Sequence, residues 1–158
     1  MKSISDRKIM QVGYVVRDLE KSAAEYSKRL GIGPWDVYTF KAPDLREAMY
    51  RGKPIDHTFL VAILWNATCQ LELIQPVTGT NIYTDFLDRH GEGLHHVKEW
   101  VDDCQQELQE YRKRGIEVLQ SGKFDEDEHY YLDTEPIFGF IYEIGNNGKI
   151  RPPERVLG

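Results

Sequence analysis

Four side chains in this sequence have the chemistry to bind one metal ion together: Gln11, Glu72, His96 and Glu143. They offer one imidazole, two carboxylates and one amide oxygen, and such nitrogen and oxygen ligands suit Zn, Mn, Co, Ni or Fe(II). The two carboxylates would balance the charge of a divalent cation. Four protein ligands would also leave room for water or for two oxygens of a substrate.

An internal repeat is the reason to group these residues. Residues 11–19 read QVGYVVRDL, and residues 96–104 read HVKEWVDDC. An ungapped alignment pairs Gln11 with His96, Val12 with Val97, Val16 with Val101, and Asp18 with Asp103. Each segment predicts a strand followed by an acidic residue that caps a helix.

Apolar residues at helical spacing follow each of the two segments. The first stripe is Leu19, Ala23, Tyr26 and Leu30, and the second is Cys104, Leu108 and Tyr111. Both predicted helices end at a Gly-Ile pair, Gly31-Ile32 and Gly115-Ile116, where glycine suits a helix C-terminus.

Three strand-like runs follow each predicted helix. They cover residues 35–40, 57–65 and 69–75 in the first half, and residues 117–120, 129–132 and 138–144 in the second. The last run of each half carries one glutamate among apolar residues, Glu72 and Glu143. Either glutamate alone would often lie on the solvent face of a sheet, but their matching places in a repeat favour a shared site. A pseudo-twofold axis would bring them together with Gln11 and His96.

The predicted fold is therefore α+β, with two βαβββ modules and a concave mixed sheet around a metal site. We expect one domain over residues 1–158. It divides into a first module at 8–76, a connecting helix and loop at 77–93, a second module at 94–146, and a C-terminal tail at 147–158. Residues 41–54, with two prolines, are interpreted as a loop. The tail is expected to be extended and to lie over a neighbour.

Composition excludes several classes of protein. The chain has 158 residues, 41% hydrophobic and 29% charged, which argues against disorder. A net charge of −6 argues against nucleic acid as a partner, because phosphate binding needs a basic face. No apolar run approaches the roughly 20 residues that cross a bilayer. The polar N-terminus and only two cysteines predict a cytoplasmic protein with reduced thiols.

Three longer motifs resemble the vicinal-oxygen-chelate superfamily of glyoxalases, bleomycin resistance proteins and dioxygenases. They are LELIQP at 71–76, GEGLHHVKEWVDD at 91–103 and FGFIYEIG at 138–145. The resemblance runs from about Ile9 to Ile144. The segment FLDRHGEGLHH at 86–96 is most similar to methylmalonyl-CoA epimerase, in which the second His binds metal.

The resemblance implies metal ligands at Glu72, four residues before Pro76, and at His96 and Glu143. The epimerase pattern has His where this chain has Gln11. The set Gln, Glu, His and Glu resembles that of eukaryotic glyoxalase I, although the surrounding residues do not. The metal chemistry is therefore expected to transfer, and the substrate is left open. A homodimer is expected from the resemblance alone.

The ligand set predicts a lyase, isomerase or epimerase. A small substrate with two neighbouring oxygens, an oxo- or hydroxy-acyl compound or a thioester, would reach an enediolate stabilised by the cation. A glutamate that loosens from the metal could serve as the base, with Glu143 preferred and Glu72 second. The alternatives are a lactoylglutathione lyase of the glyoxalase I type, a non-catalytic binding or resistance protein, and an extradiol-type dioxygenase. The dioxygenase is disfavoured because Gln11 removes one of the two His ligands that iron oxygenases use.

Other polar residues near these motifs are interpreted more simply. His95 should point away from His96 and be structural, whereas Lys98 shares the face of His96 and would meet an anionic substrate group or solvent. His57 is a weaker acid–base candidate. One residue of the pair Tyr130-Tyr131 should line the cavity, and the acidic run 125–128 is interpreted as a solvated turn.

Overall fold

The computed structural model describes residues 7–158. Within them, one eleven-stranded mixed sheet has the order β11-β2-β5-β6-β1-β7-β10-β9-β8-β3-β4. The strands are β1 (Lys8–Val15), β2 (Trp35–Phe40), β3 (Leu45–Tyr50), β4 (Lys53–Pro54), β5 (Thr58–Trp65), β6 (Gln70–Thr78), β7 (Gly93–Trp100), β8 (Val118–Phe124), β9 (Asp127–Leu132), β10 (Ile141–Gly145) and β11 (Arg155–Leu157). The helices are α1 (Leu19–Leu30), α2 (Ile82–His90), α3 (Cys104–Lys113) and α4 (Glu135–Phe138).

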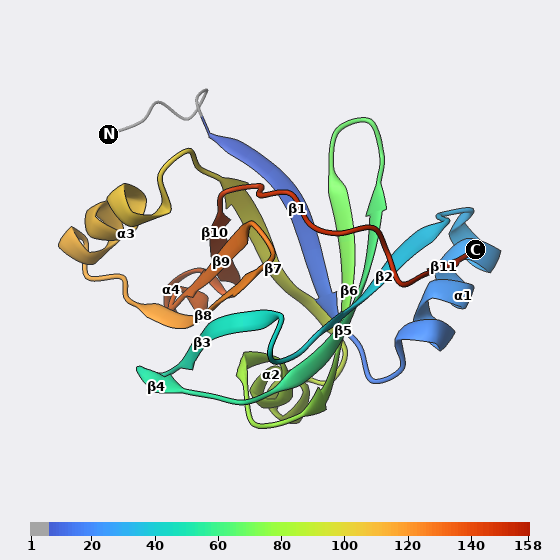
Figure 1. The fold of residues 1–158 in the computed structure, drawn as a ribbon, viewed down its shortest axis with the longest axis horizontal. Coiled ribbons are helices and arrows are strands. Elements are labelled where there is room, and N and C mark those ends of the chain that lie inside the picture. The colour runs from blue at the N-terminus through green and yellow to red at the C-terminus, as the bar shows by residue number, and fades with distance from the viewer. Residues whose placement is uncertain (1–6) are drawn as a thin grey trace.

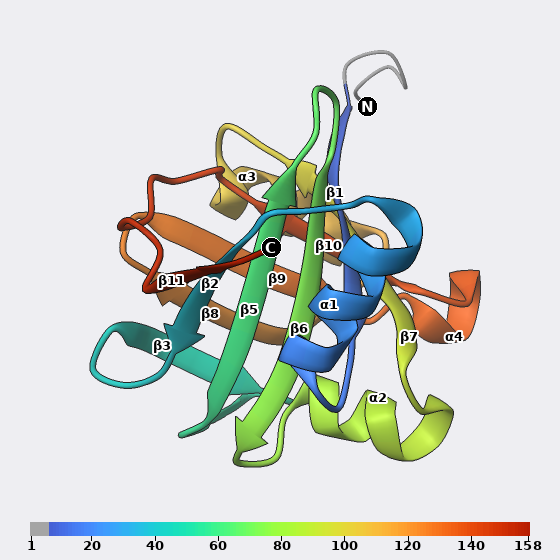
Figure 2. The same ribbon diagram turned by 90° about the vertical axis from the view of Figure 1, so that its right-hand side faces the viewer.

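The sheet is strongly curved, with α1 outside one arm and α3 outside the other (Figures 1 and 2). The predicted α+β class is confirmed, because each half contains a strand, a helix and three further strands in the same order. The first half carries an additional pair of strands, β3 and β4.

The two halves join where β1 and β7 pair antiparallel at the centre of the sheet. The register of this seam pairs Val12 with Val97, Gln11 with Lys98, and Gly13 with His96. In the repeat alignment, Gln11 is equivalent to His96 and Gly13 is equivalent to Lys98. The pair Gln11–Lys98 is therefore equivalent to the pair His96–Gly13. A local twofold axis therefore passes near the Val12–Val97 pair, as the repeat predicts.

The strands on either side of the seam obey the same symmetry. On β6, Glu72 is the parallel partner of Gly13, and on β10, Glu143 is the parallel partner of Lys98. Since Gly13 and Lys98 are themselves equivalent, the two glutamates occupy equivalent places. The seam thus positions both carboxylates next to the central pair of strands.

Both predicted helix starts are confirmed by their caps. Asp18 accepts a hydrogen bond from the backbone N–H of Lys21 at 3.0 Å, and Asp103 accepts one from Gln106 at 2.9 Å. These side chains satisfy backbone donors that the first turn of a helix leaves free. No helix within residues 7–158 has the length and apolar character needed to pass through a bilayer.

Three groups of buried side chains hold the arms in place. Two of them seat α1 and α3 on the outer faces of their own halves. The third lies between the arms and contains aromatic residues of both, with α2 packed below: Tyr38, Phe40, Phe59, Tyr83, Phe86, Phe124 and Tyr131. The inner core therefore ties the two halves into one body.

The prediction of a loop at residues 41–54 is wrong. Residues 45–50 form β3, which pairs with β8 of the second half, and β4 pairs with β3 at the edge of the sheet (Figure 1). Leu45 and Tyr50 are buried in the inner core, which gives the segment a reason to pair. Pro43 precedes the strand and Pro54 lies in the edge strand, where a missing N–H is tolerated.

The last strand of the second half is shorter than predicted. Residues 138–144 were expected to be one strand, but α4 ends at Phe138 and β10 begins at Ile141. Pro136 lies in the first turn of α4, and Gly139 ends the helix with a φ of 78°. A proline in the first turn and a glycine just after the last turn favour a short helix at this place. The predicted strand at 117–120 extends instead to Phe124.

The C-terminal tail is extended, as expected, and the neighbour it covers is its own first half. It crosses between the arms and adds β11 to the edge of β2 (Figure 1). Glu154 accepts hydrogen bonds from the backbone N–H of Thr39 at 3.1 Å and from its hydroxyl at 2.8 Å. Before that crossing, Arg151 pairs with Asp125 of the second half at 2.6 Å. The tail thus bridges both halves.

Replacing Phe124 with alanine should destabilise the chain by about 3–5 kcal/mol, the usual cost of removing a buried phenylalanine from a core. Phe124 is fully buried and stacks on Phe40 with ring centroids 4.0 Å apart. The free energy of unfolding in urea measures the effect. The matched control is Phe138→Ala, whose ring is 57% exposed and whose loss should change stability by about 0.5 kcal/mol or less. Equal losses in the two variants would contradict the role of the inner core.

Candidate metal centre and pocket

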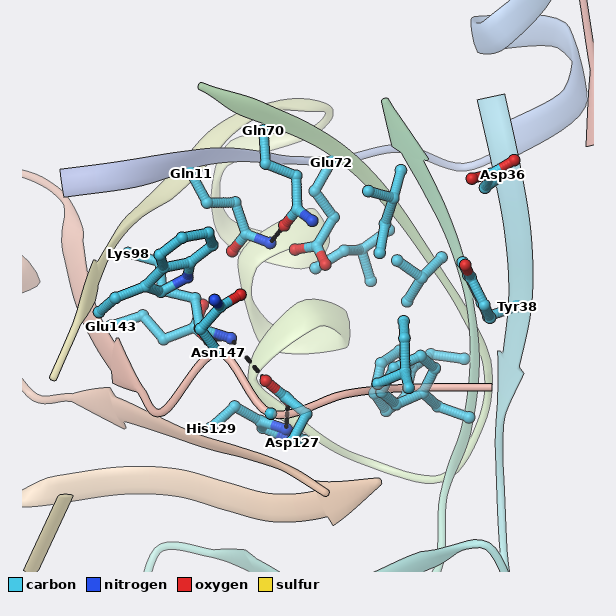
Figure 3. A pocket seen from close by; sticks show the side chains of 18 of the residues that line it. Gln11, Asp36, Tyr38, Gln70, Glu72, Lys98, Asp127, His129, Glu143 and Asn147 are labelled. Carbon is cyan, nitrogen blue, oxygen red and sulfur yellow. Dashed lines mark hydrogen bonds and ion pairs between the residues drawn. The ribbon is translucent and has the colours of Figure 1, made fainter. Parts of the chain in front are cut away.

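The fold brings the four predicted ligands to one place. His96 Nε2 lies 3.1 Å from Gln11 Oε1, 3.3 Å from Glu72 Oε2 and 3.0 Å from Glu143 Oε2. All four residues are buried, and their exposed fractions do not exceed 8%. Figure 3 shows the side chains of Gln11, Glu72 and Glu143 reaching from three strands toward the same space. The coincidence in the repeat therefore corresponds to a cluster in space.

Gly13 makes room for the imidazole of His96 at the seam. A Cβ built on Gly13 would lie 2.0 Å from His96 Cε1 and 2.4 Å from its Nε2. No side chain other than hydrogen fits opposite His96 without moving the ring. Gly145 does the same for Lys98, since its Cβ would lie 2.4 Å from Lys98 Cε. These two glycines lie on the partner strands of β7 and shape the cluster from both sides.

As they stand, no three His, Cys, Asp or Glu side chains within residues 7–158 are arranged so that they could hold a metal ion. The nitrogen of His96 instead contacts the oxygens directly. Yet Glu143 Oε2 is buried and receives no hydrogen bond of acceptable geometry from the described residues. A buried carboxylate oxygen without a donor is costly. This oxygen is therefore suited to a cation.

In the metal-free arrangement the donors do not form a metal site, but their chemistry and their distances from His96 Nε2 suit the ligands of one divalent ion. Ligand atoms about 2.1 Å from one ion and at right angles to each other are about 3.0 Å apart. The separations of 3.0–3.3 Å around His96 Nε2 are of this size. One imidazole nitrogen and three oxygens are also a donor set that zinc and its neighbours in the first transition row accept.

His95 is structural, as predicted, but the prediction that it points away from His96 is wrong, because both rings contact Tyr131. Its imidazole is fully buried, and its Nδ1 lies 2.9 Å from Nδ1 of His96. Burial lowers the pKa of His95 well below its usual range, with the neighbouring His96 adding to the effect. The neutral His95 ring can therefore accept the Nδ1–H of His96. That contact leaves Nε2 of His96 facing the oxygens, and an orienting partner on the other ring nitrogen is what metal-binding histidines commonly have.

Lys98 faces the cluster, as predicted, but its ammonium group is already paired with carboxylates of the protein. Its Nζ lies 3.0 Å from Glu143 Oε1 and 3.4 Å from Asp127 Oδ1, and its side chain is 7% exposed. His129 flanks the other oxygen of Asp127, with Nδ1 3.5 Å away. Lys98 thus links Glu143 to a third carboxylate, that of Asp127, whose side chain is 15% exposed. The interpretation of residues 125–128 as a solvated turn is wrong for Asp127, because it belongs to the site.

The charges at the cluster set the protonation of its members. Burial alone would lower the pKa of His96, but Glu143 and Glu72 outweigh it and raise the pKa to about 9. Burial would raise the pKa of Asp127, but Lys98 and His129 lower it to about 2. Against the burial of Glu143, the charges of Lys98 and His96 lower the pKa of this carboxyl. The cluster therefore holds ionised carboxylates balanced by Lys98 and a protonated His96.

A cavity of about 170 Å³ opens beside the cluster. Gln11, Glu72 and Glu143 form part of its wall, and His96 is fully buried behind them. The opposite wall is largely aromatic and aliphatic (Figure 3). The lining includes Asp36, Tyr38, Phe40, Phe59, Val61, Ile63, Trp65, Gln70, Ile74, Tyr83, Lys98, Trp100, Asp127, His129 and Tyr131, with Asn147, Gly148 and Ile150 of the tail.

The weaker candidates, the pair Tyr130-Tyr131 and His57, have different outcomes. Tyr131 lines the cavity and Tyr130 does not, which confirms that one of the pair would. His57 is buried outside the cavity, where burial, with His129 adding to it, lowers its pKa to about 4. It is not an acid–base group of this site.

Sequence reasoning missed several residues of the site. Gln70 lies two residues before Glu72 on the same face of β6, and the amide of Gln11 donates to its oxygen. Strand periodicity could have found Gln70. Asp127 and His129 could not be found in that way, because their places depend on how β9 packs beside β10. Gly13 carries no signal of its own without its cross-strand partner.

The family model of the glyoxalase/bleomycin resistance protein/dioxygenase superfamily matches residues 10–132. No curated protein matches the chain by sequence. Among solved structures, a hypothetical protein from Bacillus halodurans is similar with a TM-score of 0.67 and 17% identity, covering 95% of this chain and 99% of that one.

Two epimerases are also similar in fold. Methylmalonyl-CoA epimerase from Mycobacterium tuberculosis has a TM-score of 0.64 at 17% identity, over 96% of this chain and 94% of that one. A Streptomyces coelicolor methylmalonyl-CoA epimerase variant in complex with 2-nitronate-propionyl-CoA has a TM-score of 0.61 at 17% identity, over 88% and 96%. At such identities the likeness shows the fold alone.

Gly13→Ala should displace the imidazole of His96, because the added methyl group would overlap the ring. We expect the side-chain ¹⁵N and ¹H resonances of His96 to shift, with a loss of about 1–3 kcal/mol in stability from overpacking. Nuclear magnetic resonance of the histidine rings and urea unfolding measure the two effects. Val12→Ala, on the other face of the same strand, is the control. An unchanged His96 ring in Gly13→Ala would contradict the close approach.

Proposed function

Because the chain belongs to the glyoxalase/bleomycin resistance protein/dioxygenase superfamily, we propose that it is a divalent-metal-dependent lyase or isomerase. Its substrate is a small oxo or hydroxy compound with two neighbouring oxygens. One observation carries the proposal: oxygens of Gln11, Glu72 and Glu143 lie within 3.0–3.3 Å of His96 Nε2 at the wall of a cavity. The comparisons support the family, and the chemistry is proposed from the site.

The four side chains would hold the cation through the Nε2 of His96 and one oxygen each of Gln11, Glu72 and Glu143. With His96 neutral, Glu72, Glu143 and Asp127 exceed Lys98 by two negative charges, which a divalent cation would balance. When bound, the cation would supply Lewis-acid polarisation of the two neighbouring oxygens of the substrate. His95 and Lys98 would orient His96 and Glu143 from behind.

Glu72 is better placed than Glu143 to move a proton. Lys98 holds one oxygen of Glu143 at 3.0 Å, whereas among residues 7–158 the one ion pair of Glu72 is its contact of 3.3 Å with His96. Glu72 also keeps 11% of its side chain exposed, against 2% for Glu143. Glu72 can therefore turn into the cavity at a lower cost. We propose Glu72 as the base and Glu143 as the fixed ligand, which reverses the order favoured by the sequence.

A second candidate function is a binding protein that works without metal. The observation that favours it is that Lys98 and a protonated His96 already balance the carboxylates to within one charge in the metal-free site. The aromatic wall of the cavity would then bind the ligand. Metal titration separates this candidate from the enzyme, since a binding protein of this kind would take up no stoichiometric cation.

Zinc titration of the metal-free chain should show one ion bound per chain. Binding should release about one proton at pH 7, because His96 has a pKa of about 9 and must lose its proton to bind a cation. Isothermal titration calorimetry in two buffers of different ionisation enthalpy measures both quantities, and elemental analysis checks the stoichiometry. His96→Ala should lose the ion.

His90→Ala is the matched control, because His90 is exposed at the end of α2 and pairs with Glu135. It should bind zinc as the wild type does. Wild-type protein that binds no zinc after reconstitution would remove the basis of the proposed enzyme and favour the metal-free binding protein.

Glu72→Gln should lower turnover by about 10²–10⁴-fold, the usual contribution of a general base, while it keeps an oxygen for the metal. Deuterium uptake from D₂O next to the carbonyl measures proton removal. The compounds to compare are hydroxyacetone, which is uncharged, and two anionic compounds, the hemithioacetal of methylglyoxal with glutathione and methylmalonyl-CoA. Glu143→Gln should lose less turnover than Glu72→Gln at saturating metal. Full exchange activity in Glu72→Gln would exclude it as the base.

A further inference from the structure

We infer that the pocket selects a compact, largely apolar compound without negative charge, and that it rejects anions. This inference rests on the proposed function for the two neighbouring oxygens, which would face the ligand cluster. The preference in charge and size comes from the whole cavity wall, to which Asp36, Asp127 and the apolar residues contribute beside the proposed metal ligands.

Negative charge dominates the wall of the cavity. Four carboxylates line it, those of Asp36, Glu72, Asp127 and Glu143. Lys98 is the one lysine or arginine among the described residues that line it. The four carboxylates exceed Lys98 by three charges, and with His129 neutral a divalent cation would cancel only two of them. The loaded site would therefore remain unfavourable to an anionic substrate group.

Lys98 is not available to pair with such a group. Its Nζ lies between Glu143 and Asp127, at 3.0 and 3.4 Å, and the residue is 6% exposed. A substrate carboxylate or phosphate would have to displace one of these buried partners and leave it without a counter-charge. The sequence-based expectation that Lys98 could meet an anionic substrate group is therefore replaced by a structural role.

The side of the cavity opposite the ligand cluster is apolar. Tyr38, Phe40, Phe59, Val61 and Ile63 line it from β2 and β5, and Figure 3 shows Tyr38 across the cavity from Gln11 and Glu143. The cavity measures about 170 Å³, and a dry cavity of about 150 Å³ is known to hold one benzene molecule. The enclosed part of a substrate is therefore about the size of one ring or a short branched chain.

Two tryptophans form an aromatic border to this cavity. Trp65 ends β5 and Trp100 ends β7, their ring centroids are 5.4 Å apart, and both contribute to the lining. Trp65 is 50% exposed. Flat indole rings favour contact with apolar or cationic groups. Asp36 adds a carboxylate on β2, and Lys98, the one lysine of the described lining, is already paired with Glu143 and Asp127 and is not free for a diphosphate. A coenzyme A ester is thus a poor substrate for this pocket.

An isosteric pair of chelating probes tests the inference on the zinc-loaded full chain. Both 4-carbamoylbenzohydroxamate and 4-carboxybenzohydroxamate present two neighbouring oxygens, and they differ in one negative charge. We expect the carbamoyl probe to bind at least about tenfold more tightly, because the excess carboxylates repel the second probe. Quenching of tryptophan fluorescence measures both dissociation constants.

Asp36→Asn should reduce this ratio at least about threefold, because it removes one lining carboxylate that the cluster does not use. Asp102→Asn, an exposed position away from the cavity, is the matched control and should leave the ratio unchanged. Equal binding of the two probes, tighter binding of the carboxy probe, or no binding of either would overturn the inference while zinc binding still supports the proposed function.

If the chain binds no zinc, the proposed function fails and the inference is tested separately. Benzamide and benzoate, which do not chelate, are then compared on the metal-free chain by the same fluorescence signal. A preference of at least about threefold for benzamide that Asp36→Asn weakens would support the charge selection. Equal binding, or binding of neither, would overturn it.

Discussion

The antiparallel pairing of β1 with β7 is the constraint on which the site depends. Its register sets Gly13 against His96 and Gln11 against Lys98, and the local twofold axis between them relates the two halves. A slip of one residue would turn every side chain of one strand to the other face of the sheet. The cluster would then be divided between the two faces. Buried apolar side chains at equivalent places in the two halves hold this register in place.

The cluster buries charged side chains, which is unfavourable for stability but gives the site its capacity for chemistry. Glu72 and Glu143 are buried near one lysine, and Asp127, with 15% of its side chain exposed, lies beside the same lysine. Removing such groups from water is unfavourable unless each is paired. Lys98 links two of them, and His96 faces two of them. Of these three carboxylates, Glu143 has a fully buried oxygen, Oε2, without a hydrogen-bond donor among the described residues, and this oxygen marks where the pairing is incomplete.

Two segments outside the repeat give the cavity its particular shape. The inserted strand β3 extends the second arm and brings Leu45 and Tyr50 into the inner core. The tail then crosses from the second half to β2 and adds Asn147, Gly148 and Ile150 to the lining. Proteins that share the curved sheet can therefore differ in the shape and lining of the pocket through such additions. This is a physical reason why likeness of fold does not carry a substrate with it.

The sequence by itself determined the repeat, its two capped helices, the class of the fold and the four residues that converge. Each of these depends on local periodicity or on equivalence between halves, which a single chain displays. Only the tertiary structure decided that Lys98 pairs with Glu143 and Asp127, that Gly13 admits His96, and that Glu72 is the freer carboxylate. It also decided that residues 45–50 join the second half. These contacts join residues from different strands, and their energies depend on burial and on neighbours that spacing along the chain does not specify.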